Sequence, residues 1–198
     1  MKTMKRFFVL MLAGLLCSSA ASAQGWLDAM KRVATDAIDQ ATGGKLTEKA
    51  IVGTWNYSAP GVKINSSDML ANVGGTVMES TVSEKLKGIY EKVGIVPGAC
   101  TITFADDNTF SMPVKGRAVT GTYEFDPSTH AITLHVGKLK TAVTGYAYIS
   151  GGNLQLVFPV DKLVSFVTAV GSKISSLSSL STLLQKYDDV NLGFEFSK

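Results

Sequence analysis

The chain has 198 residues, of which 19 are basic and 16 acidic, so its formal net charge is +3. Three of the bases lie in residues 1–23, which hold no acid, so residues 24–198 carry 16 charges of each sign. This neutral remainder gives no reason to expect binding to nucleic acid or to an anionic membrane. Its length suits one domain with a substantial hydrophobic core.

The first 23 residues have the three parts of a secretory signal peptide. Lys2, Lys5 and Arg6 form a basic start, an apolar run covers residues 7–16, and small residues occupy positions 21–23. The apolar run is too short to span a bilayer, and no later stretch is long and apolar enough to do so. The sequence therefore predicts an exported, not transmembrane, protein that is periplasmic or secreted, with cleavage after Ala23.

Two cysteines are present, and cleavage would leave only Cys100. Lipid attachment at Cys17 is the alternative to cleavage after Ala23, but Leu16 stands where lipoprotein processing requires a small residue. A single cysteine allows no intramolecular disulfide, so burial of apolar surface must supply the stability of the fold.

Residues 24–50 form a predicted N-terminal helical segment. Between Trp26 and Ala41, apolar residues recur at helical spacing and charged residues take the opposite face, while Gly43 and Gly44 end the pattern. This periodicity predicts an amphipathic helix that must dock on some surface.

A first strand is predicted over residues 51–59, where Trp55 and Tyr57 alternate with polar residues, and Pro60-Gly61 is expected to end it. A helical insertion follows over residues 68–93. Its Gly74-Gly75 pair is expected to kink or split that helix.

From residue 99 to residue 158 the apolar period changes from 3.6 to 2, which predicts a meander of about six strands joined by hairpins. A second helical insertion is expected over residues 160–187, and a last strand over residues 191–197. The count is then about eight antiparallel strands over residues 51–198. A barrel or a sandwich would cover their apolar faces, and consecutive hairpins favour the closed barrel.

The first strand carries Gly53-Thr54-Trp55, which resembles the Gly-x-Trp signature of lipocalins and related calycins. The hairpin over residues 104–110 also resembles the turn of small lipocalin-like domains. The whole of residues 24–198 is similar to a lipocalin-like family of exported gut-bacterial proteins. This resemblance implies a barrel in which Gly53 and Trp55 close one end. Where lipocalins have an arginine near the last strand, this sequence offers Lys198.

The alternation predicts which side chains face the barrel interior. An eight-stranded barrel has room for side chains or for one small ligand, so the interior could be either filled or hollow. Small residues on the predicted strands favour some space. The residues expected to line a ligand site are Met112, Gly121, Tyr123, Gly145, Ala147 and Phe158.

No motif for catalysis, a cofactor or a metal site stands out. His130 and His135 have no cluster of carboxylates or cysteines beside them, so we expect two surface histidines. Cys100 is in register with apolar residues and is expected in the core. Residues 106–108 have the composition of a turn and lack the remaining ligands of a calcium loop.

Two functions stay open at this point. The first is a non-catalytic carrier that binds a small hydrophobic ligand inside the barrel. The second is an envelope or secreted protein-interaction module with a filled barrel and no ligand. An open apolar cavity would favour the first, whereas a solid interior with an exposed apolar helix face would favour the second.

Overall fold

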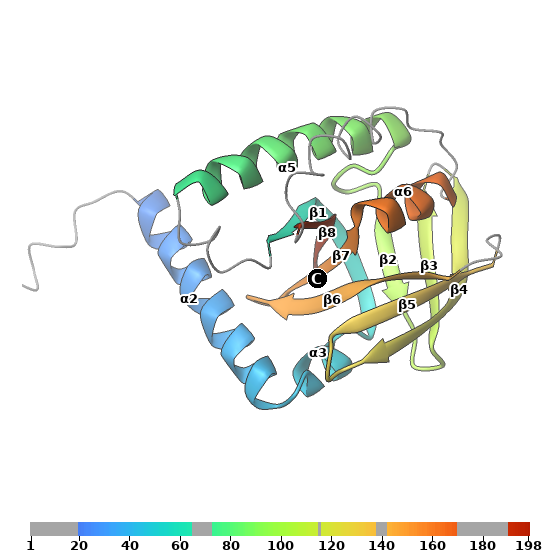
Figure 1. The fold of residues 1–198 in the computed structure, drawn as a ribbon, viewed down its shortest axis with the longest axis horizontal. Coiled ribbons are helices and arrows are strands. Elements are labelled where there is room, and N and C mark those ends of the chain that lie inside the picture. The colour runs from blue at the N-terminus through green and yellow to red at the C-terminus, as the bar shows by residue number, and fades with distance from the viewer. Residues whose placement is uncertain (1–19, 65–72, 115, 138–141, 170–189) are drawn as a thin grey trace, which may run out of the picture.

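The computed structural model describes residues 20–64, 73–114, 116–137, 142–169 and 190–198. Helices precede the first strand, and two further helices interrupt the series of strands (Figure 1). In chain order they are α2 (Ala20–Ala41), α3 (Lys45–Ala50), β1 (Gly53–Ile64), α5 (Val73–Val93), β2 (Thr101–Phe104), β3 (Thr109–Val114), β4 (Arg117–Asp126), β5 (Ala131–Val136), β6 (Val143–Ser150), β7 (Asn153–Pro159), α6 (Val160–Ala169) and β8 (Val190–Ser197).

The eight strands form one closed antiparallel barrel in sequence order. Strands β2 to β7 form a meander, and β8 pairs with both β7 and β1 to complete the ring. This confirms the predicted fold class, including the six-strand meander and the closing role of the last strand. Closure leaves no exposed sheet edge of full length, which removes a surface that could pair with other chains.

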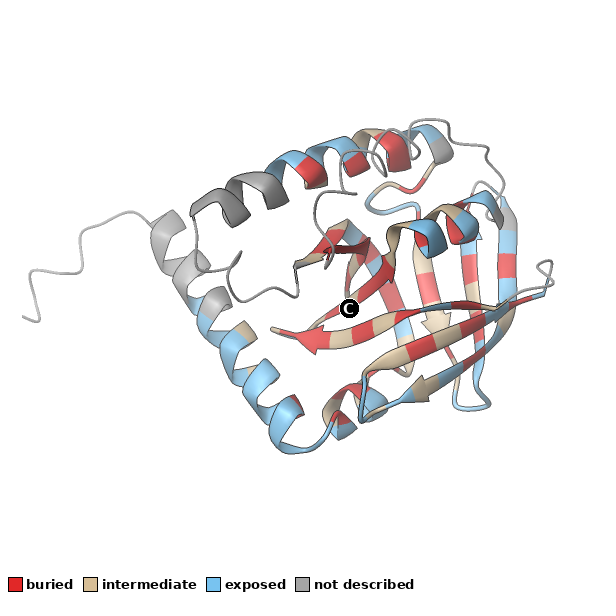
Figure 2. Ribbon diagram, in the orientation of Figure 1, coloured by how far each residue is buried: buried red, intermediate tan, exposed pale blue. Residues whose placement is uncertain are grey.

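Side chains alternate between the interior and the outside along most strands, as Figure 2 shows by colour. In β5, for example, Ile132, Leu134 and Val136 are buried while His135 is exposed. The buried residues form a single hydrophobic cluster that includes residues of α5 and α6. The period-2 pattern of the sequence therefore corresponds directly to an apolar barrel interior.

Strand β1 is longer than predicted, because it continues through Pro60 and Gly61 to Ile64. A register irregularity lies between Tyr57 and Ala59 in its pairing with β8, and the strand then continues as far as Ile64 opposite Val190. Pairing of β1 with β2 stops at Asn56. The Tyr57 N–H still bonds the Cys100 carbonyl at 2.9 Å. Beyond Tyr57 one side of β1 has no ladder partner among the described residues, which is where a strand tolerates a proline.

The Trp55 end of the barrel is closed by α3 and by the chain terminus. Trp55 is 1% exposed, and its indole Nε1 donates a hydrogen bond to the Ile51 carbonyl at 2.7 Å. The Lys198 ammonium lies 4.4 Å from the centre of the Trp55 ring. Gly53 has a φ of 125°, a conformation that favours glycine, and its Cα lies beside the Lys198 side chain. Lys198 therefore covers the Trp55 ring, and β8 contains no arginine such as lipocalins have near the last strand.

Helices α5 and α6 pack on other parts of the barrel. The predicted apolar face of α5 is confirmed, since Val82, Leu86 and Tyr90 are fully buried, and the Tyr90 hydroxyl donates to the Gly193 carbonyl at 2.9 Å. The described helix begins at Val73, so the glycine pair at 74–75 lies in its first turn and does not split it. The predicted start near residue 68, and residues 170–187 of the second insertion, lie outside the described residues.

Helix α2 contains the predicted segment Trp26–Ala41 and runs continuously from Ala20, across the predicted cleavage point. It packs on the barrel with its polar side, through Arg32 and Asp39. Arg32 pairs with Glu195 of β8 at 2.8 Å. The helix therefore docks, as expected, and it does so with its polar face, while its apolar face points to solvent. Its large apolar residues are 45–71% exposed and comprise Leu27, Met30, Val33 and Ile38.

Candidate functional site

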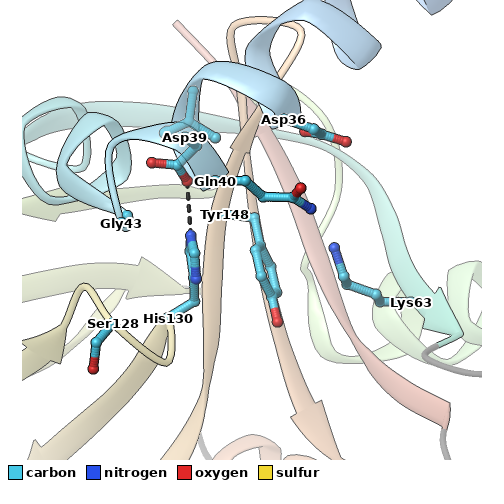
Figure 3. Close-up of a pocket in the computed structure, with 10 residues that line it drawn as sticks. Asp36, Asp39, Gln40, Gly43, Lys63, Ser128, His130 and Tyr148 are labelled. Carbon is cyan, nitrogen blue, oxygen red and sulfur yellow. Dashed lines mark hydrogen bonds and ion pairs between the residues drawn. The ribbon is translucent and has the colours of Figure 1, made fainter.

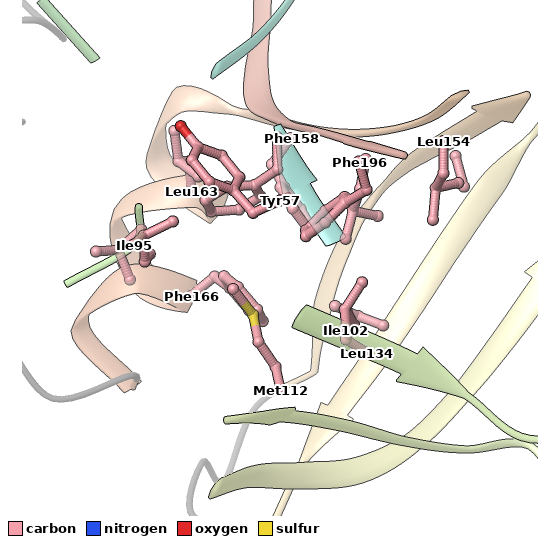
Figure 4. Packing of buried hydrophobic residues seen from close by; sticks show 14 of the residues in the cluster. Tyr57, Ile95, Ile102, Met112, Leu134, Leu154, Phe158, Leu163, Phe166 and Phe196 are labelled. Atoms are coloured by element: carbon pink, nitrogen blue, oxygen red, sulfur yellow. The ribbon is translucent and has the colours of Figure 1, made fainter. Parts of the chain in front are cut away.

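The residues predicted to line an interior ligand site do face the inside of the barrel. Met112, Ala147 and Phe158 are fully buried, and Tyr123 is 5% exposed. The Tyr123 hydroxyl donates to the Ala105 carbonyl at 3.2 Å. Figure 4 shows Met112 and Phe158 among the packed side chains of the core. The Tyr123 hydroxyl is thus already bonded within the protein, and the apolar surface of all four side chains is covered.

The small residues of the interior do not provide the expected space. A β-carbon added at Gly145 would collide with the ring of Phe158 and lie 2.5 Å from the Val157 carbonyl oxygen. One added at Gly121 would collide with the His135 carbonyl oxygen and approach Phe110. Both glycines permit close approach of neighbouring strands and rings, so at these positions the barrel is filled.

A pocket of about 430 Å³ lies instead outside the barrel, between α2 and the barrel wall. Figure 3 shows side chains that line it on α2, on the turn after α2 and on the neighbouring strands. The lining residues come from α2, from the α2–α3 turn, from β1, from the β4–β5 turn and from β6: Asp36, Asp39, Gln40, Gly43, Gly44, Lys63, Ser128, His130, Tyr148 and Ile149. Most of them carry polar or charged groups, which distinguishes this pocket from the apolar interior.

Asp39 is the buried anchor of the pocket, with 3% of its surface exposed. One carboxylate oxygen accepts the Thr47 backbone N–H at 3.0 Å, and the other accepts the Thr47 hydroxyl and contacts His130 Nε2 at 2.8 Å. Burial acts to raise the pKa of Asp39, but the hydrogen bonds from Thr47 and His130 outweigh it and leave the pKa below 3.8. Asp39 therefore remains ionised and its oxygens are already engaged.

Thr47 extends this network from the helices to the barrel. Its hydroxyl oxygen accepts the Ile149 N–H of β6 at 3.1 Å. The tight turn before α3 brings Thr47 back to Asp39, and Gly44 has a φ of 78° there, with the Pro127 carbonyl packed against its Cα. A side chain at Gly44 would have no room and an unfavourable φ. The α2–α3 turn is therefore fixed to the barrel wall by buried hydrogen bonds.

Tyr148 forms the floor of the pocket, with its ring between His130 and Lys63 (Figure 3). The His130 ring stacks on it with centroids 4.9 Å apart and planes at 21°. The Lys63 ammonium lies 3.7 Å from the ring centroid. Such a cation–π contact stabilises a partly desolvated ammonium. Burial, with a smaller contribution from Tyr146, raises the pKa of Tyr148 to about 12, so its hydroxyl stays neutral.

Lys63 and Asp36 give the pocket opposite charges. Burial lowers the pKa of Lys63, and the negative charge of Asp36 partly offsets that effect. Asp36 and Gln40 project from exposed positions of α2. The arrangement supplies an ammonium, a carboxylate and an amide near an aromatic ring, which suits recognition of a small polar molecule.

The sequence did not predict this pocket. His130, expected at the surface, has a side chain only 16% exposed and pairs with Asp39 from 91 positions away. His135 is indeed at the surface, 45% exposed and 3.3 Å from Glu124. The one sequence signal for a special role of His130 is its place next to a predicted turn. The structure confirms that turn, and His130 has a φ of 59° there. Among the described residues, no group of three or more histidines, cysteines and carboxylates lies close enough to hold a metal ion.

One protein family matches most of the chain. A family model described as a lipocalin-like domain (DUF4923) matches residues 28–198. The chain belongs to this lipocalin-like family. The match includes α2 from residue 28 onward, the pocket and the entire barrel, so the pocket lies within the lipocalin-like domain.

Other comparisons add little. No curated protein matches the chain. Among solved structures, it is similar to the crystal structure of a DUF4847 family protein from Bacteroides vulgatus ATCC 8482, at 14% identity and a TM-score of 0.37, covering 77% of this chain and 96% of that one. Within the described residues, no helix has both the length and the apolar character needed to cross a bilayer.

Proposed function

We propose that this lipocalin-like protein is an exported, non-catalytic binding protein that holds a small polar ligand in the pocket between α2 and the barrel. The observation that carries the proposal is the Lys63 ammonium, which is held over Tyr148 at the edge of a 430 Å³ pocket. A volume of this size is typical of small-molecule sites. Export rests on the signal peptide predicted for residues 1–23.

The rigid base of the pocket supports a binding role. Asp39, Thr47 and His130 connect α2 to the barrel by buried hydrogen bonds, so the wall and the floor are held together before any ligand arrives. Preorganisation of this kind lowers the cost of ordering side chains on binding. A carrier of an apolar ligand inside the barrel has less support, because Phe158 and the neighbouring strands already occupy the space beside Gly145 and Gly121.

A ligand panel tests the proposal. It contains amino acids, dicarboxylates, sugars, nucleosides and fatty acids, and binding is measured by isothermal titration calorimetry. We expect a polar member to bind with a Kd below about 1 mM, or roughly −4 kcal/mol. Lys63→Gln and Tyr148→Ala should weaken that binding at least tenfold, while the interior variant Met112→Leu should not change it. Binding of fatty acids alone, weakened only by Met112→Leu, would contradict the proposal.

A second candidate function is contact with another macromolecule, which the exposed apolar face of α2 favours. Leu27, Met30, Val33 and Ile38 remain 45–71% exposed on the side of the helix opposite Arg32 and Asp39. The simplest partner is a second copy of the chain, because a two-fold helix pair needs only one self-complementary surface. Sedimentation equilibrium tests this. A dimer that Val33→Glu converts to a monomer would support it, and a monomeric parent protein would contradict it.

A further inference from the structure

The pocket contains one cation and one carboxylate that have no ion-pair partner among the described residues, although the cation lies over the Tyr148 ring. Among the described residues, neither Lys63 nor Asp36 belongs to an ion pair, although Asp36 is near enough to act on the charge of Lys63. Asp39 is different, since Thr47 and His130 already engage its oxygens. The groups free to meet a ligand are therefore a positive and a negative charge that face the same space without contact.

Gln40 adds a side-chain amide, which is both a hydrogen-bond donor and an acceptor, to this part of the pocket. Figure 3 shows the side chains of Asp36, Gln40 and Lys63 gathered at one end, on the opposite side of Tyr148 from His130. An amide both donates and accepts hydrogen bonds, so Gln40 can bond either a carboxylate or an ammonium group. The remaining pocket, toward Ser128 and Gly43, is open to the rest of a ligand.

Charge balance limits what this set of groups can bind. A simple anion would pair with Lys63 but meet the negative charges of Asp36 and Asp39. A simple cation would pair with Asp36 but meet Lys63, whose ammonium is already partly desolvated. A charged group that leaves water is stabilised only where an opposite charge compensates it. A ligand with both charges satisfies both side chains at once.

We infer that the pocket between α2 and the barrel binds small zwitterions of the α-amino-acid type. The ligand carboxylate pairs with Lys63, the ligand ammonium pairs with Asp36, and Gln40 bonds to either end. This inference rests on the proposed function of the pocket and specifies its ligand class. The Tyr148 ring supports Lys63 and lies beneath the ligand.

The test uses the full chain and three forms of one molecule. L-serine, N-acetyl-L-serine and L-serinamide differ in whether the ammonium or the carboxylate charge is present, and the same three forms of L-leucine and L-phenylalanine vary the side chain. Calorimetry gives each Kd. We expect at least one free amino acid to bind ten times or more tightly than both of its derivatives.

Variants assign each charge to its partner. Asp36→Asn should reduce the affinity for the free amino acid to that for the N-acetyl form, while Lys63→Gln should reduce it to that for the amide. The matched controls Asp161→Asn and Lys162→Gln change an exposed pair on α6, away from the pocket, and should have no effect. Unfolding midpoints of all four variants show whether a loss of binding comes from a loss of fold.

Two other results would overturn the zwitterion inference, and they differ in what they imply for the proposed function. If the N-acetyl form binds as tightly as the free amino acid, the pocket is a simple anion site, which overturns the zwitterion inference but leaves a polar ligand in place. If no member of the series binds below about 10 mM, the inference is overturned, and the wider panel described above then decides whether the proposed function also fails.

Discussion

The ring of Phe158 on β7 lies directly against Gly145 on the neighbouring strand β6, and a β-carbon added at Gly145 would collide with that ring. Phe158 also stacks on Phe166 of α6, with centroids 5.4 Å apart and planes at 15°. The glycine therefore makes room for an aromatic ring of the protein. This pairing explains why a small residue on β6 does not indicate a ligand cavity.

Gly145→Ala should destabilise the protein by about 1–3 kcal/mol, because overpacking a filled core forces rings and strands apart. The measurement is the urea midpoint of unfolding. Gly88→Ala is the matched control, since Gly88 lies inside α5 with nothing within 4 Å of an added β-carbon. That change should stabilise the protein by about 0.5–1 kcal/mol. An unchanged midpoint for Gly145→Ala would show that the interior has space after all.

Asp39→Asn should make the protein less stable at neutral pH by about 1–3 kcal/mol, because the hydrogen bonds from Thr47 and His130 lose their charged acceptor. The folded-state pKa of Asp39 is lowered from 3.8, so its contribution is complete above that value and disappears as the pH falls through the folded-state pKa. Urea unfolding at pH 7, 4, 3 and 2.5 should therefore show the two proteins converging. A constant difference down to pH 2.5 would refute this assignment.

The thiol of Cys100 should be unreactive in the folded protein. It is fully buried, and burial raises its pKa to about 11, so little thiolate exists at pH 8. A Cys17→Ser background leaves Cys100 as the sole thiol. Reaction with a chromogenic disulfide reagent should be at least a hundredfold slower in buffer than in 6 M guanidinium. Equal rates would place Cys100 at the surface.

Trp55→Ala should lower the free energy of unfolding by about 3–5 kcal/mol, since it removes a fully buried aromatic ring and its hydrogen bond to Ile51. Lys198→Met keeps an aliphatic chain over the indole but removes the cation and its 3.4 Å hydrogen bond to the Ala50 carbonyl, so it should cost about 0.5–2 kcal/mol. Both values come from urea unfolding. A larger effect for Lys198→Met than for Trp55→Ala would contradict the packing described for this end of the barrel.

Most of the barrel was predictable from the sequence because it depends on local alternation. The period-2 pattern of residues 99–158 defines six strands and their buried faces, and hairpin connections determine their order. The extension of β1 through Pro60 was not predictable, since it depends on where β2 stops pairing. The filling of the space beside Gly145 also depends on a residue of another strand, Phe158.

The pocket was not predictable for a related reason. Its network joins Asp39, Thr47, His130 and Ile149, which come from four separate segments. Helical periodicity correctly identified the two faces of α2 but did not show which of them contacts the barrel, and apolar faces are the ones that usually dock. Here hydrogen bonds and the Arg32–Glu195 pair hold the polar face on the barrel instead.

The location of the bound ligand tests whether the pocket between α2 and the barrel is the binding site. Amide and side-chain chemical shifts of the isotope-labelled protein are followed by NMR while the tightest-binding member of the panel is added. We expect the largest changes at the Gln40 side-chain amide, Lys63, His130 and Tyr148, with the interior amides of Met112 and Phe158 unchanged. Large changes confined to Met112, Phe158 and their interior neighbours would contradict this expectation and place the ligand inside the barrel.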